Sequence, residues 1–175
     1  MAQDRIRGGF LARVLRHRWL DESDTRKAIP PDLMERLARR IAASEKRHTG
    51  EVRIYVEAGL PMSYLWRDAT PRERAVAVFG KLRVWDTEDN NGVLIYLLLA
   101  EHAIEVVADR GLARHVAPDD WQAIVTRLGA ALREGRFEDG LTQALEEVSA
   151  LLVRHFPAAE GAANVNELPD EPVLG

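Results

Sequence analysis

Four oxygen-bearing side chains stand out as possible ligands for a metal ion. Asp86, Asp89 and Asn91 fall in the segment DTEDNN, and Asp109 opens the tripeptide Asp-Arg-Gly further along the chain. Carboxylate and amide oxygens are the ligands that Ca²⁺ and Mg²⁺ prefer. The chain has no Cys, which excludes a thiolate site for a softer metal. We therefore predict a Ca²⁺ or Mg²⁺ site formed by these four residues.

The same region offers groups that bind anions. Arg110 could pair with a phosphate, and Asp119 lies at the start of a predicted helix whose first amides are free. His48 precedes the first predicted strand and belongs to the same predicted ligand-binding group. A second interpretation needs no ligand, because Asn-Asn-Gly is common turn chemistry and an Asp at a helix start complements the helix dipole. The sequence leaves both interpretations open.

Known catalytic and metal-binding motifs are absent from the sequence. An EF-hand that begins at Asp86 fails, because its sixth position is Asn91 and its twelfth is Leu97, where the motif needs Gly and Glu. The five His form no His-Glu-x-x-His, and there is neither a Gly-rich phosphate loop nor a Gly-x-Ser-x-Gly elbow. The sequence thus identifies no catalytic residue.

Three predicted strands must position these side chains. Residues 51–58 alternate and predict a half-exposed strand, residues 93–99 are apolar throughout and predict a central one, and residues 103–108 predict a third. A helical crossover makes the first two parallel, and the short turn Glu101-His102 makes the last two antiparallel. We expect an α/β fold: a three-layer α/β/α sandwich with a small mixed sheet in order 1-2-3, with room for a short extra strand, and helices on both faces. This topology brings the polar segments to one edge of the sheet.

The N-terminal region differs in charge from the rest of the chain. Residues 1–20 hold five Arg and one Asp, a net charge of +4, whereas the remainder carries −8. Residues 9–20 predict an amphipathic helix with these residues on its apolar face: Phe10, Leu11, Val14, Leu15 and Trp19. Its basic residues are Arg13, Arg16, His17 and Arg18. Such a helix packs on its own domain or lies on an anionic membrane or a protein partner.

The organisation along the chain follows from these patterns. We predict a basic helix with a polar linker over residues 1–29, an α/β domain over residues 30–156, and a disordered acidic tail over residues 157–175. A net charge of −4 and the lack of a long basic stripe argue against a nucleic-acid partner. No apolar run reaches membrane-spanning length, and the first residues do not resemble a secretion signal, so a cytoplasmic location is expected.

Several short motifs together resemble the TPM domain family, named for plant thylakoid-lumen, photosystem-II-associated and nematode receptor-modulator proteins. They are His48-Thr49-Gly50-Glu51, Asn91-Gly92-Val93-Leu94-Ile95, Ala108-Asp109-Arg110-Gly111 and Gly135-Arg136-Phe137-Glu138-Asp139-Gly140. The resemblance covers roughly residues 32–156 and is closest to bacterial members without a signal peptide. It implies an α/β/α sandwich. It also implies a divalent-metal site near the Asp-Asn-Gly loop of some relatives, phosphatase activity in a plant relative, and membrane-associated accessory roles in many others.

One departure from the family pattern concerns the loop itself. Many relatives have Asp-Asn-Gly where this chain has Asn90-Asn91-Gly92, so that Asn90 replaces an acid beside Asp89. The favoured hypothesis is a non-catalytic accessory or scaffold domain that contacts a membrane or protein partner through residues 9–20, with a cation at the sheet edge. The alternatives are a metal-dependent phosphatase with its site at residues 86–91 and 109–110, and a small-ligand or ion sensor at the same edge.

Overall fold

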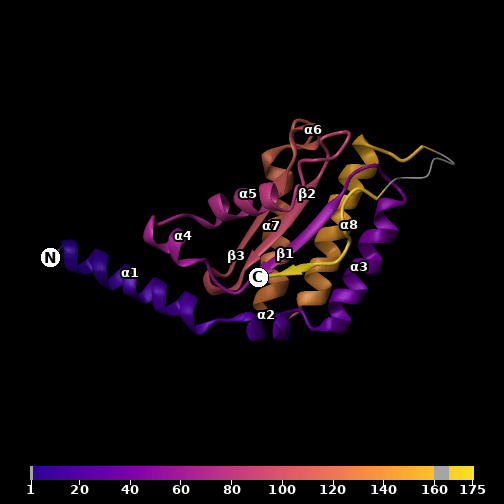
Figure 1. The fold of residues 1–175 in the computed structure, drawn as a ribbon. Helices are drawn as coiled ribbons and strands as arrows, with labels where there is room; N and C mark the ends of the chain where they lie inside the picture. Colours follow the sequence, from indigo (N-terminus) through magenta and orange to yellow (C-terminus); the bar gives the residue numbers. More distant parts are fainter. Residues whose placement is uncertain (1, 160–165) are drawn as a thin grey trace.

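A single mixed sheet lies at the centre of the protein in the computed structural model, which describes residues 2–159 and 166–175, and side chains from residue 10 onward (Figure 1). Its strands are β1 (Val52–Glu57), β2 (Val93–Leu98), β3 (Ala103–Ala108) and β4 (Val173–Leu174), in the order β3-β2-β1-β4. β1 runs parallel to β2, and β2 runs antiparallel to β3. The predicted α/β class and these strand directions are confirmed, and β4 extends the predicted order beyond β1.

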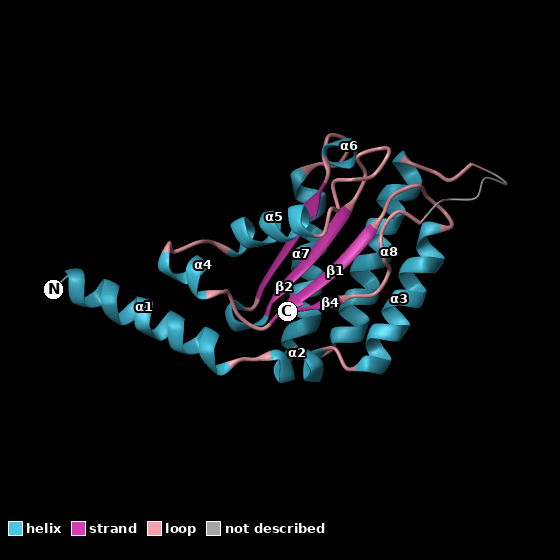
Figure 2. Cartoon of the chain, in the orientation of Figure 1, coloured by secondary structure: helices cyan, strands magenta, loops and turns pink. Residues whose placement is uncertain are grey.

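Helices flank both faces of the sheet (Figure 2). They are α1 (Ala2–Trp19), α2 (Glu22–Ala28), α3 (Pro31–Glu45), α4 (Met62–Trp66), α5 (Pro71–Lys81), α6 (Arg110–Ala113), α7 (Pro118–Arg133) and α8 (Phe137–His155). α3, α7 and α8 share one apolar core with one face of the strands, whereas α4 and α5 share a second core with the other face. No helix in the described part of the chain is long and apolar enough to cross a membrane.

The residues of β2 explain its central place. Every residue from Val93 to Leu98 is buried, as the unbroken apolar run predicts. The prediction for β1 is wrong, however, because all six of its residues are buried as well. Its polar positions, Arg53 and Glu57, meet buried charges from other elements instead of water. Alternation therefore marks two chemically different faces of β1, both of them covered.

The end of the chain also departs from the prediction of a disordered tail. Val173 and Leu174 pair in parallel with Tyr55 and Val56 of β1, and the Gly175 amide donates to the Val56 carbonyl at 2.9 Å. These main-chain bonds cover the edge of the sheet. The prediction is wrong for residues 166–175, and residues 160–165 lie outside the described part.

The predicted polar linker contains a helix, α2. It begins with a capping box in which Asp21 accepts from the Ser23 amide at 2.7 Å and Asp24 accepts from the Asp21 amide at 3.1 Å. The segment between β1 and α5 contains the short helix α4. The connection between β2 and β3 is a short 3₁₀ turn, Leu99–Glu101, that ends at His102 with φ 50°.

Candidate functional site

The polar ends of β2 and β3 lie side by side at one edge of the sheet, as predicted. The Asp109 amide donates to the Gly92 carbonyl at 2.9 Å, and the Gly111 amide donates to the Asn90 carbonyl at 2.8 Å. A Cβ at Gly111 would stand 2.3 Å from the Asn90 carbonyl oxygen, so only glycine permits this close approach. The tripeptide Asp-Arg-Gly therefore fastens the two loops together.

Thr49 ties the start of β1 to the same edge. Its hydroxyl donates to Asp89 Oδ2 at 2.8 Å and accepts from Asn91 Nδ2 at 3.0 Å. Asn90 adopts φ 53°, a left-handed conformation that Asn tolerates better than most residues. Asn90 thus supplies the positive φ of the turn, and Asp89 and Asn91 are joined through Thr49.

Asp109 and Asn91 each keep one oxygen without a partner. Asp109 Oδ1 accepts from the Arg110 amide at 2.7 Å and caps α6. Asp109 Oδ2 and Asn91 Oδ1 are buried and have no hydrogen-bond partner within residues 2–159 and 166–175. Buried acceptors are normally satisfied, so these two atoms are the strongest local sign of a missing ligand or water.

Two other predicted site residues, Asp86 and Asp119, lie at the surface. Asp86 is exposed, with its carboxylate 3.9 Å from Arg83 Nη1. Asp119 is exposed in the first turn of α7. Among the described residues, no three His, Asp or Glu side chains gather as a metal site. The residues present therefore offer a cation two free oxygens rather than the gathered carboxylates that the sequence suggests.

His48 lies inside the protein rather than at its surface. Its ring is buried, and its Nε2 lies 2.9 Å from the Ser44 hydroxyl, which in turn donates to Ser149 Oγ at 2.7 Å. Burial lowers the pKa of His48 to about 4, so the ring is neutral at pH 7. These contacts join α3 to α8, so His48 has a structural role in the interior beside the polar edge of the sheet.

An open, polar cavity of about 500 Å³ lies at this edge. Its lining includes the predicted residues Asp89 and Arg110, together with Arg114 and His115, which the sequence reasoning missed. The His115 ring stacks on His155, with 5.1 Å between ring centroids. The only sequence signal for Arg114 and His115 was their place just after Asp-Arg-Gly. Basic side chains thus outnumber acids around the cavity, which favours an anion over a cation there.

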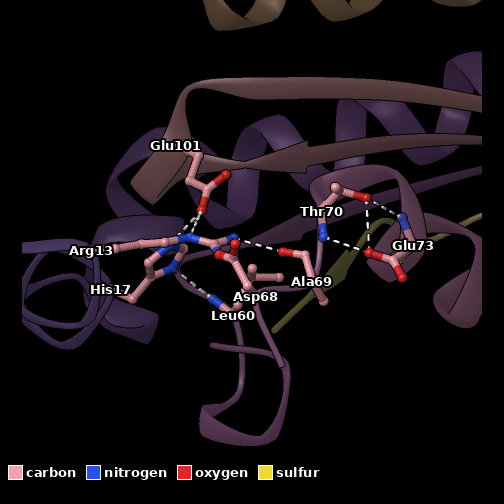
Figure 3. A network of polar contacts seen from close by, with 8 residues as sticks. All are labelled: Arg13, His17, Leu60, Asp68, Ala69, Thr70, Glu73 and Glu101. Carbon is pink, nitrogen blue, oxygen red and sulfur yellow. Dashed lines mark hydrogen bonds and ion pairs between the residues drawn. The ribbon is translucent and has the colours of Figure 1, made fainter. Parts of the chain in front are cut away.

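A second polar cluster, far from this edge, holds α1 on the domain (Figure 3). Arg13 donates to Glu101 at 2.7 Å, to Asp68 at 2.5 Å and to the Ala69 carbonyl at 2.6 Å. His17 Nδ1 accepts from the Leu60 amide at 2.9 Å, so Nε2 carries the proton and donates to Glu101 at 2.9 Å. We call the contacts of Arg13 and His17 the helix latch.

The helix latch is electrostatically matched. Burial alone would raise the pKa of Glu101, but the hydrogen bonds from Arg13 and His17 hold that pKa below its usual value. Thr70 and Glu73, beside Ala69, form the capping box that begins α5. The latch therefore joins α1 to rigid ends of neighbouring elements.

The latch sets the orientation of the N-terminal helix, which the sequence left open. Its inward side is formed by Arg13, Val14 and the buried His17. Leu11, Leu15 and Trp19 face solvent, with 59%, 56% and 83% of their surface exposed. The helix is therefore held on its own domain by its polar side, and most of its apolar side chains are left exposed.

A mixed sheet between helices, with polar loops joined at one edge, defines an α/β domain of the kind that the motifs suggested. The chain belongs to the TPM domain family, whose model matches residues 23–151. It is similar in structure to the NMR structure of BA42 protein from the psychrophilic bacterium Bizionia argentinensis, with 26% identity, a TM-score of 0.70, and coverage of 81% of this chain and 91% of that one.

A second solved structure shares the fold. The NMR structure of the N-terminal domain of a protein from P. gingivalis has 19% identity and a TM-score of 0.59, with coverage of 75% of this chain and 83% of that one. A comparison with curated proteins gives no match. Family and fold are therefore established by these similarities, and the activity is a separate question.

Proposed function

We propose that the chain is a non-catalytic accessory domain that attaches to an anionic membrane surface through α1. The observation that carries the proposal is the orientation of this helix. Its polar side is bound to the domain by the helix latch, and its apolar side is left in solvent. The proposed location is peripheral, on the cytoplasmic side of the inner membrane.

The exposed apolar side chains of α1 form one stripe. Leu11, Leu15 and Trp19 are spaced four residues apart, so they lie one above another along the helix. Arg16 and Arg18 are exposed beside them. Apolar side chains enter the boundary between headgroups and acyl chains, and each Arg near an anionic surface adds about 1 kcal/mol. This combination supports an anionic membrane over a neutral protein surface.

Vesicle sedimentation tests this attachment. The full chain is expected to sediment with vesicles that contain phosphatidylglycerol and to do so less at high salt. Replacing Leu11, Leu15 and Trp19 by Ser is expected to reduce binding more than tenfold, because the variant loses the apolar area that enters the membrane. Arg13 must stay unchanged, since it holds the helix.

A matched control is Trp85→Ser. Trp85 is half exposed on the loop after α5, so its replacement removes part of a large exposed apolar side chain away from α1. This variant is expected to bind like the unaltered chain. Failure of the unaltered chain to sediment would overturn the proposal and leave the stripe of α1 for a protein partner.

A divalent cation at the sheet edge is a second candidate, favoured by the two buried oxygens of Asn91 and Asp109. Ca²⁺ takes six to eight oxygen ligands, so two protein oxygens with Asp89 nearby would bind a largely hydrated ion. The proposed affinity is therefore weak, with Kd on the order of 10⁻³ M. The phosphatase alternative depends on the same ion and has no separate observation in its favour.

A titration with Ca²⁺ and Mg²⁺, followed by amide NMR, checks this candidate. Saturable shifts are expected at Asp89, Asn91 and Asp109. Asp109→Asn is expected to weaken them at least tenfold, because it removes a full negative charge at the ion. Asp119→Asn, an exposed change, serves as the control. A flat titration of the unaltered chain would exclude the site.

A further inference from the structure

A largely apolar cavity of about 470 Å³ lies at the opposite end of the sheet from the polar loops. It lies between the turn that joins β2 to β3 and the connection from α7 to α8. Side chains from both regions line it, among them Leu97, Ile104, Leu132 and Phe137. Cavities of roughly 300–1,000 Å³ with apolar walls and few polar groups are the usual shape of small-molecule sites.

One cation stands at the mouth of this cavity without a partner. Arg133, the last residue of α7, is exposed and makes no ion pair or hydrogen bond with any residue in 2–159 or 166–175. The nearby acids are already paired, Glu134 with Arg136 at 2.6 Å and Glu138 with Arg36 at 2.8 Å. His102 also lines the opening. The free charge beside the apolar walls is therefore positive.

Gly129 keeps one wall of the cavity open. It lies in the middle of α7, where Gly costs about 1 kcal/mol relative to Ala. A Cβ at this position would stand 3.4 Å from Ile104 Cδ1, an ordinary contact, so no clash requires Gly there. The missing side chain instead leaves space beside Ile104, within the cavity.

We propose that this cavity binds a small amphipathic carboxylate, with its apolar chain against Leu97, Ile104 and Phe137 and its carboxylate on Arg133. The planar guanidinium matches a carboxylate with two parallel hydrogen bonds. A neutral apolar molecule would leave that group unused, and a cationic one would be repelled by it. No described residue of α1 or of the polar edge lines this cavity.

Calorimetric titration of the full chain with decanoate, below its micelle concentration, tests the proposal, with decanol as the neutral comparison. Decanoate is expected to bind one site, and Arg133→Gln is expected to weaken it at least fivefold while leaving decanol unchanged. Gly129→Leu is expected to abolish binding of both, because the new side chain fills the cavity. This change also favours the helix, so the variant stays folded.

Arg154→Gln provides the matched control, since Arg154 is an exposed Arg near the far end of α8. It is expected to leave decanoate binding unchanged. The amide NMR shifts that decanoate causes are expected only at residues around Ile104 and Phe137. The proposal is overturned if decanoate does not bind, if Arg154→Gln weakens binding as much as Arg133→Gln does, or if Gly129→Leu still binds.

Discussion

Replacement of Arg74 by Met is expected to lower the free energy of unfolding by about 3–5 kcal/mol. Arg74, on α5, donates to both carboxylate oxygens of Glu57 on β1, at 2.9 Å and 2.5 Å. The two side chains are only 12% and 5% exposed. The variant would leave a buried carboxylate without its counter-charge, although the Tyr96 hydroxyl would still donate to it at 2.7 Å. Chemical denaturation at pH 7 measures the loss.

The neighbouring Arg72 supplies the control for this prediction. It lies on the same helix, is half exposed, and approaches Glu105 at 3.4 Å. Arg72→Met is therefore expected to cost less than about 1 kcal/mol. Adding Glu57→Gln to Arg74→Met is expected to restore part of the stability, because no buried charge remains. Equal losses for Arg72→Met and Arg74→Met would contradict the importance of the buried pair.

The ion pair of Glu57 shows why the sequence predicted the sheet better than its surroundings. Burial of β2 follows from its own apolar residues, and strand direction follows from the connection lengths. The cover on β1 depends on a charge 17 residues away at Arg74 and on a strand formed by residues 173–174. The alternation of apolar and polar residues within one strand does not indicate such distant partners, so Arg53 and Glu57 were predicted to face water.

The candidate site was predicted in part for the same reason. Topology brought Asp89, Asn91 and Asp109 to one edge, as expected. Topology could not show that the Thr49 hydroxyl donates to Asp89 or that Asp109 caps α6, because these contacts depend on side-chain rotamers. The sequence also left the orientation of α1 open, since hydrophobicity alone does not show that Arg13 and His17 have matched partners on the domain.

Replacement of Glu45 by Gln is expected to abolish most of the fall in stability that the unaltered chain shows between pH 7 and pH 9. Glu45 ends α3 and is buried beside Glu51, near Arg53 of β1 and Asp170 of the C-terminal segment. Its Oε1 accepts from the Val52 amide at 3.1 Å. Burial, together with the charge of Glu51, raises the pKa of Glu45 to about 9. Burial also raises the pKa of Glu51.

The direction of the effect follows from proton binding. The folded chain retains a proton on Glu45 that the unfolded chain releases above its ordinary pKa of 4.5. The stability from this proton is complete below that pH and is lost as the pH rises towards 9. Between pH 7 and 9 the loss is on the order of 2–3 kcal/mol. His48, whose pKa is lowered, acts in the opposite direction only below its ordinary pKa of 6.5, outside this range.

Gln at position 45 is the uncharged counterpart of the protonated acid, so this variant should have a nearly flat stability profile between pH 7 and 9. Unfolding by denaturant at several pH values in this range measures the slope. Glu35→Gln is the control, because Glu35 is exposed on the same helix and pairs with Arg39 at 3.5 Å. It should keep the slope of the unaltered chain. If Glu45→Gln keeps that slope too, Glu45 does not hold a proton at pH 7.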